Sequence, residues 1–131
     1  MAMLAVILGA FGAHSLENLL DPQQLDTFET GARYQFYHAF GLLVVGLLLY
    51  WRKNKLLLAA GWFFLTGIVL FSGSLYALSL AEALEIDLSG YGIITPVGGF
   101  GFIAGWACLM FATFGKNEKN YKRKSTAPRE E

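Results

Sequence analysis

The chain has 131 residues, of which 55% are apolar and only 15% are charged. Its mean hydropathy of +0.46 lies outside the range of a soluble domain and predicts a protein embedded in a lipid bilayer. The formal net charge is zero, and the single cysteine, Cys108, excludes a disulfide framework and a thiolate metal site.

Four apolar segments predict an all-α fold, a bundle of four transmembrane helices that forms one domain over residues 1–114. We expect the spans at about 1–13, 34–51, 56–80 and 93–114. The segments are separated by short polar stretches, which are the expected loops.

The first apolar segment, residues 1–13, is short for a transmembrane helix. It would be about 20 Å long, against about 30 Å for the hydrocarbon core of a bilayer. We therefore expect either that the helix continues through residues 14–17 or that the chain begins late.

A short amphipathic helix is expected over residues 22–30, in the first loop. Asp21 is a good N-cap, Pro22 suits the first helical position and Gln24 can complete a capping box. Apolar residues then follow at helical spacing, and this pattern predicts a helix lying on the membrane surface. They are Leu25, Phe28 and Ala32.

The distribution of charge predicts the topology. Nine of the ten Lys and Arg residues lie in the turn 52–55 or in the tail 115–131, and only Arg33 lies elsewhere. Seven of the ten acidic residues lie in the loops 14–33 and 81–92. Since positive loops stay in the cytoplasm, both termini should be cytoplasmic. The basic tail is expected to be disordered, and attraction to anionic lipid headgroups explains it better than nucleic-acid binding does.

Four polar residues, two just before the second span and two in its first turns, are the main candidates for function. Glu29 and Arg33 have the spacing and order of a helical ion pair. A charged side chain is costly in lipid unless it is solvated or paired with an opposite charge. Gln35 and His38 form a second polar edge, so at least one edge should face another helix. A structural role is the favoured interpretation of both edges. A transport or catalytic role for Glu29 and Arg33, and a proton-relay or metal role for His38, are the alternatives. His14 has no partner at metal-ligand spacing, so no metal site is predicted.

Small and polar residues in the third and fourth spans predict close helix packing. Ser72, Ser74 and Tyr76 form a polar patch that can hydrogen-bond between helices, although a permeation path would use similar residues. Glycines at one face of the fourth span and in the first span allow helix backbones to approach closely. They are Gly98, Gly101 and Gly105, and Gly9.

Four motifs together resemble one known family. They are Gly-Ala-Phe-Gly-Ala-His at 9–14, the entry to the second span that ends in Arg-Tyr-Gln-Phe-Tyr-His at 33–38, Leu-Phe-Ser-Gly-Ser-Leu-Tyr at 70–76, and Ile-Thr-Pro-Val-Gly-Gly at 94–99 with Ala-Gly-Trp at 104–106. The chain is similar, in order and spacing up to about residue 114, to the small integral membrane proteins called domain of unknown function 423. The resemblance implies a four-helix protein of the bacterial cytoplasmic (inner) membrane, without an established activity or catalytic residues. Members usually carry more apolar sequence before the first motif, which agrees with a late start.

The pattern as a whole favours a non-enzymatic interaction or assembly protein that holds a membrane-protein partner. The alternative is a minimal transporter or channel for a small solute or ion, which works as a homo-oligomer. An intramembrane enzyme is disfavoured, because no catalytic constellation is present in the sequence. No cofactor is expected.

Overall fold

The computed structural model describes residues 1–114, and the regular secondary structure of these residues consists of helices. The elements are α1 (Ala2–Phe11), the π-helical turn η1 (Gly12–Leu16), α2 (Pro22–Trp51), α3 (Lys55–Gly67), the π-helical turn η2 (Ile68–Ser72), α4 (Gly73–Ala83), the 3₁₀ turn η3 (Ser89–Tyr91) and α5 (Ile94–Phe114). The prediction of an all-α bundle is confirmed for this part of the chain. The predicted disordered tail at 115–131 lies outside the described residues.

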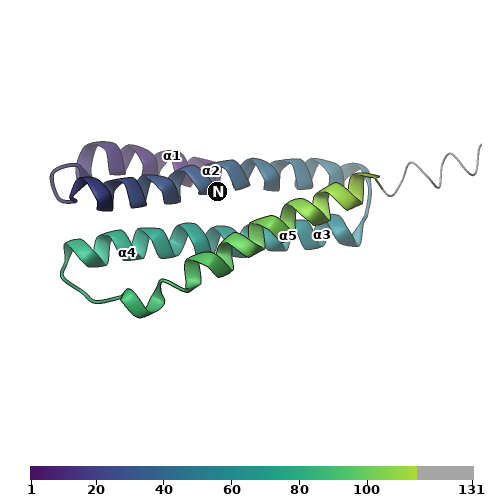
Figure 1. The fold of residues 1–131 in the computed structure, drawn as a ribbon. Coiled ribbons are helices and arrows are strands. Elements are labelled where there is room, and N and C mark those ends of the chain that lie inside the picture. Colours follow the sequence, from purple (N-terminus) through teal and green to yellow (C-terminus); the bar gives the residue numbers. More distant parts are fainter. Residues whose placement is uncertain (115–131) are drawn as a thin grey trace, which may run out of the picture.

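Among the described residues, three helices are long and apolar enough to cross a membrane. They are α2, the continuous helix formed by α3, η2 and α4, and α5, and they lie side by side along a common direction (Figure 1). The apolar helix Ala2–Leu16 is shorter, about 22 Å at 1.5 Å per residue, and packs beside the first half of α2.

Helix α2 begins with the predicted capping box. The Asp21 side chain accepts hydrogen bonds from the backbone N–H groups of Gln23 and Gln24, and the Gln24 side chain accepts one from the N–H of Asp21. Residues 22–30 are helical as expected, but they are the first turns of α2 and not a separate surface helix. The reason is packing, because Phe28 is buried in a cluster with Leu16 and other apolar side chains of α1, η1 and α4.

Two apolar clusters form the core. One fills the space between α2, α3, η2 and α5, and it includes Leu57, Phe64 and Phe102. The other lies beneath the α1–α2 loop and is centred on Phe28. The two clusters hold the two ends of the bundle, and the polar residues of α2 lie between them.

Helix α5 crosses α3 and η2 at its glycines. A Cβ atom on Gly98 would lie 2.4 Å from the backbone nitrogen of Phe71, and one on Gly105 would lie 2.7 Å from the Phe64 ring. At Gly101 the same atom would be 3.3 Å from the Cα of Gly67. Gly98 and Gly101 therefore lie where two helix backbones come close together, the geometry that small residues permit in membranes. Gly105 instead makes room for the Phe64 ring.

The first helix packs less tightly than this crossing. A Cβ atom on Gly9 would lie 4.0 Å from the Ala32 Cβ, which is ordinary contact. A Cβ atom on Gly12 would lie 3.0 Å from the Phe28 ring. Gly12 is buried, whereas Ala13 is exposed. Small residues line the side of this helix that packs on α2. On this side Ala5 and Gly9 are followed by Gly12 and not by Ala13.

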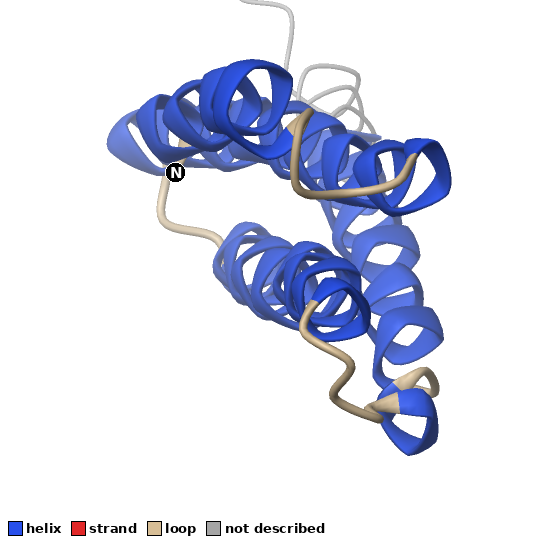
Figure 2. Ribbon diagram, turned by 90° about the vertical axis from the view of Figure 1, so that its left-hand side faces the viewer, coloured by secondary structure: helices blue, strands red, loops and turns tan. Residues whose placement is uncertain are grey.

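Acidic and basic residues lie at opposite ends of the bundle. The α1–α2 and α4–α5 loops share one end, which faces the viewer in Figure 2, and the α2–α3 turn lies at the other (Figures 1 and 2). The first end carries Glu17, Asp21, Glu82, Glu85 and Asp87, and the second carries Arg52, Lys53 and Lys55.

Candidate functional site

The polar residues of α2 divide into an outer and an inner edge. Glu29 and Arg33 lie on the outer edge, with side chains 42% and 52% exposed, while Gln35 and His38 on the inner edge are 2% and 6% exposed. The expectation that one edge faces other helices therefore holds for the inner edge.

The outer pair lies in a shallow notch between α1 and α2. The Arg33 guanidinium and the Glu29 carboxylate are 3.9 Å apart, which is longer than the 2.7–2.9 Å typical of a charge-assisted hydrogen bond. The notch has a volume of about 330 Å³. Its lining residues are Ala5, Val6, Gly9, Glu29, Ala32, Arg33 and Phe36.

The surface around the notch is apolar. Helix α1 presents a row of exposed apolar side chains that a bilayer would cover, namely Met3, Leu4, Val6, Ile7 and Phe11. Glu29 and Arg33 lie beside the middle of this helix, at the level of Val6 and Gly9. On the α1 side the two charges are thus bordered by surface that has the character of a lipid contact, whereas the exposed Asp26 lies one turn before Glu29 on α2.

On the inner edge, the side chain of Gln35 joins three helical segments. The Tyr76 hydroxyl donates a 2.9 Å hydrogen bond to Gln35 Oε1, and Gln35 Nε2 donates one of 3.2 Å to the backbone carbonyl of Met1. The Tyr76 ring also packs on Phe28, and its edge would lie 2.9 Å from a Cβ atom on Gly31. These contacts fix α1 and α4 against α2.

The imidazole of His38 is held by its own helix and by α5. Its Nδ1 lies 2.8 Å from the backbone carbonyl of Tyr34, which can only accept, so Nδ1 carries the proton. The ring is stacked on Phe102, with centroids 3.4 Å apart and planes inclined by 6°. In this neutral form of the ring, Nε2 carries no proton and can accept a hydrogen bond.

The serines of the third span have three different surroundings. Ser72 is fully buried, and its hydroxyl has no hydrogen-bond partner among the described residues. Ser74 lies 2.7 Å, hydroxyl to hydroxyl, from Thr95 and links α4 to α5. Ser79 donates to the backbone carbonyl of Leu75.

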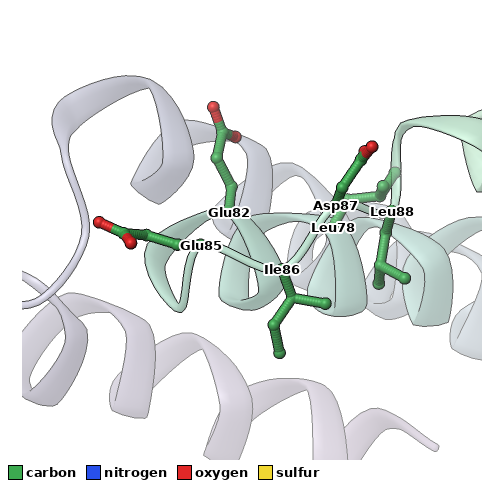
Figure 3. Close-up of a pocket in the computed structure, with 6 residues that line it drawn as sticks. All are labelled: Leu78, Glu82, Glu85, Ile86, Asp87 and Leu88. Carbon is green, nitrogen blue, oxygen red and sulfur yellow. The ribbon is translucent and has the colours of Figure 1, made fainter.

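His14 is exposed in η1. Among residues 1–114, no group of three or more His, Cys, Asp or Glu side chains could hold a metal ion. The acidic α4–α5 loop is an example. A cavity of about 450 Å³ lies beside it, but the carboxylates of Glu82, Glu85 and Asp87 point in different directions and do not converge on one point (Figure 3).

Several residues that complete these sites could not be recognised in the sequence. Thr95, Phe102 and Trp106 lie in the fourth span and meet the polar residues of the second and third spans. Tyr34 likewise meets another span, because its ring packs on Phe71 with ring centroids 4.8 Å apart. A single sequence gives the face of each helix, but not the register between helices.

The sequence matches a family model described as a protein of unknown function (DUF423) over residues 8–99. The UPF0382 membrane protein YwdK of Bacillus subtilis is 46% identical, and the match covers 85% of this chain and 87% of YwdK. The UPF0382 inner membrane protein YgdD of Escherichia coli is 37% identical, over 80% of this chain and 76% of YgdD. No solved structure matches the chain.

Proposed function

We propose that this chain, which belongs to the DUF423 family of membrane proteins, is a non-enzymatic assembly protein. Its partner would be a transmembrane helix of another protein that carries a polar side chain. The helix would dock in the notch between α1 and α2, with its polar group against Glu29 and Arg33.

The observation that carries the proposal is the exposure of this ion pair on an apolar surface. Each charge is about half exposed, and the two atoms closest to one another are 3.9 Å apart, so neither charge is satisfied by the other alone. Charged groups facing lipid are costly and usually mark a functional contact. A polar side chain of a docked helix would supply the missing hydrogen bonds.

The shape of the notch also supports a helix as the occupant. Gly9 and Ala5 present little side chain, and small residues allow a partner backbone to come close. By contrast, Gln35 and Tyr76 satisfy each other inside the bundle, which favours a structural role for them.

The orientation of the chain is part of the proposal. The basic turn and the acidic loops lie at opposite ends of the bundle. By the positive-inside rule, the end with Arg52 and Lys53 is cytoplasmic, as is the end of α5. Met1 does not lie at that end, because its carbonyl contacts Gln35 part-way along α2. Because Glu29 and Arg33 belong to the first half of α2, the notch lies in the outer half of the membrane.

The proposal is tested by purification in mild detergent from cells that express the protein at its native level. The wild type is compared with the double variant Glu29→Ala/Arg33→Ala and with the control Lys53→Ala/Lys55→Ala, which removes two charges at the other end. We expect one stoichiometric membrane-protein partner that is lost only from the Glu29→Ala/Arg33→Ala variant.

Two results would contradict the proposal. Retention of the partner by the Glu29→Ala/Arg33→Ala variant would remove the notch from the interface. A homo-oligomer without any partner would favour the alternative, a minimal transporter or channel. That alternative would then be tested by flux into liposomes, with Gln35 and His38 as the first residues to change.

A further inference from the structure

A second site is formed on another face of the bundle, where α2 and α5 diverge beside η2. It is a groove with a volume of about 540 Å³, within the range of small-molecule pockets. Its lining residues are Tyr34, His38, Phe71, Pro96, Gly99, Phe100, Phe102, Ile103 and Trp106. Because Phe100 and Ile103 are largely exposed on α5, the groove opens towards lipid and not towards an aqueous loop.

His38 lines this groove and has an unused nitrogen. The side chain is more than nine-tenths buried, and its Nδ1–H donates to the carbonyl of Tyr34. Nε2 of a neutral imidazole is then a hydrogen-bond acceptor, and it has no partner among the described residues. A polar atom that faces an apolar groove without a partner is poorly solvated, so a ligand that donates to it is favoured.

Two more polar groups lie among the apolar walls. Within residues 1–114, neither the Tyr34 hydroxyl nor the indole N–H of Trp106 has a hydrogen-bond partner. The remaining surface is aromatic or aliphatic, and Phe71 and Phe102 present rings to the groove. Aromatic walls favour a flat ring, which stacks or packs edge-to-face against them.

We propose that this groove binds a membrane-dissolved phenol, a hydroxylated aromatic ring with an apolar tail. The ring hydroxyl donates to Nε2 of His38, the ring lies against Phe102 and Phe71, and the tail leaves the groove over Ile103 into lipid. A lipid acyl chain would fill the same volume but would leave Nε2 without a donor. The site is separate from the α1–α2 notch and does not depend on the proposed partner.

The test uses the purified protein in lipid nanodiscs and a matched pair of probes, 4-octylphenol and its methyl ether 4-octylanisole. The probes share ring and tail, and only the phenol can donate a hydrogen bond. Trp106 is kept as the single fluorophore by the changes Trp51→Phe and Trp62→Phe, so its emission reports on the groove. We expect saturable binding of the phenol, with an affinity at least ten times that for the ether.

Two variants test the role of the groove. His38→Asn retains a donor near the position of Nδ1 but removes Nε2, so the preference for the phenol should disappear. His14→Asn, at the exposed histidine, is its control. Gly99→Leu adds a side chain to the wall of the groove and leaves the His38 residue unchanged; a Cβ there makes only ordinary contacts, the nearest 3.8 Å from the Phe71 ring. Gly46→Leu, where a Cβ meets nothing within 4 Å, is the control for that change.

The proposal is wrong if both probes bind equally or if neither saturates. It is also wrong if His38→Asn keeps the preference for the phenol. Should His38→Asn fail to fold, Gly99→Leu decides: loss of phenol binding in that variant, with binding retained in Gly46→Leu, supports the groove, and unchanged binding overturns it.

Discussion

Tyr76 and Gln35 are 41 positions apart in the chain, and the Tyr76 hydroxyl donates a 2.9 Å hydrogen bond to the Gln35 side chain. The same amide donates to the carbonyl of Met1, so a single glutamine connects α1, α2 and α4. Since Gln35 is almost fully buried, a side chain that is polar in the sequence acts in the structure as a fixed point for three helices.

Removal of the Tyr76 hydroxyl should destabilise the bundle. Tyr76→Phe keeps the ring on Phe28 but leaves Gln35 Oε1 without a donor. We expect a loss of about 1 kcal/mol in the free energy of unfolding, the usual size of an interhelical hydrogen bond in a membrane. A double-mutant cycle with Gln35→Leu, measured in bicelles, should give a coupling of similar size, and zero coupling would show that the bond contributes nothing.

Gly98→Ala should be one of the most damaging small changes in the chain. The added Cβ would lie 2.4 Å from the backbone nitrogen of Phe71, so the two helices must separate. We expect destabilisation by about 3 kcal/mol, at the upper end of the range for overpacking. Gly46→Ala is the control, because a Cβ there meets nothing, and it should stabilise α2 by about 0.5–1 kcal/mol. Equal effects of the two changes would refute the close crossing.

Ser72→Ala should raise stability. The hydroxyl of Ser72 is buried without a partner among the described residues, and its removal avoids a desolvation cost of about 1–3 kcal/mol. Ser79→Ala removes a hydroxyl that donates to the Leu75 carbonyl, and it should be neutral or slightly destabilising. If unfolding shows that Ser72→Ala destabilises the protein more than Ser79→Ala does, Ser72 has a polar role that these contacts do not account for.

The proposed orientation predicts the location of the end of α5. A reporter fused after Phe114 should be active only in the cytoplasm, because the basic turn at 52–55 lies at the same end of the bundle. A matching fusion in the α4–α5 loop should report the opposite side of the membrane. Reversed signals would invert the topology and would place the notch in the cytoplasmic half.

Much of the fold follows from local physics. The cap formed by Asp21 and Gln24 depends on side chains three residues apart, and apolar length alone predicts the long helices. The continuity of α2 could not be predicted, because it depends on the burial of Phe28 against α1 and α4. A pattern that is amphipathic in the sequence suits a membrane surface and a helix interface equally well.

The candidate sites also divide into a part that the sequence predicts and a part that it does not. The spacing of Glu29 and Arg33 indicates their contact, and the helical wheel separates them from Gln35 and His38. The sequence does not predict the aromatic groove around His38, because Phe71 and Phe102 come from different spans whose relative register is set by the glycines of α5.

The most direct test of the assembly role is site-specific photocrosslinking in living cells. A photoreactive amino acid is placed at Val6, on the rim of the notch, and at Leu47 as the lipid-facing control on α2. We predict one discrete crosslink to another membrane protein from Val6, absent from Leu47 and abolished by Glu29→Ala/Arg33→Ala. A crosslink from Val6 that survives the loss of both charges, or one only between copies of this chain, would contradict the proposed function.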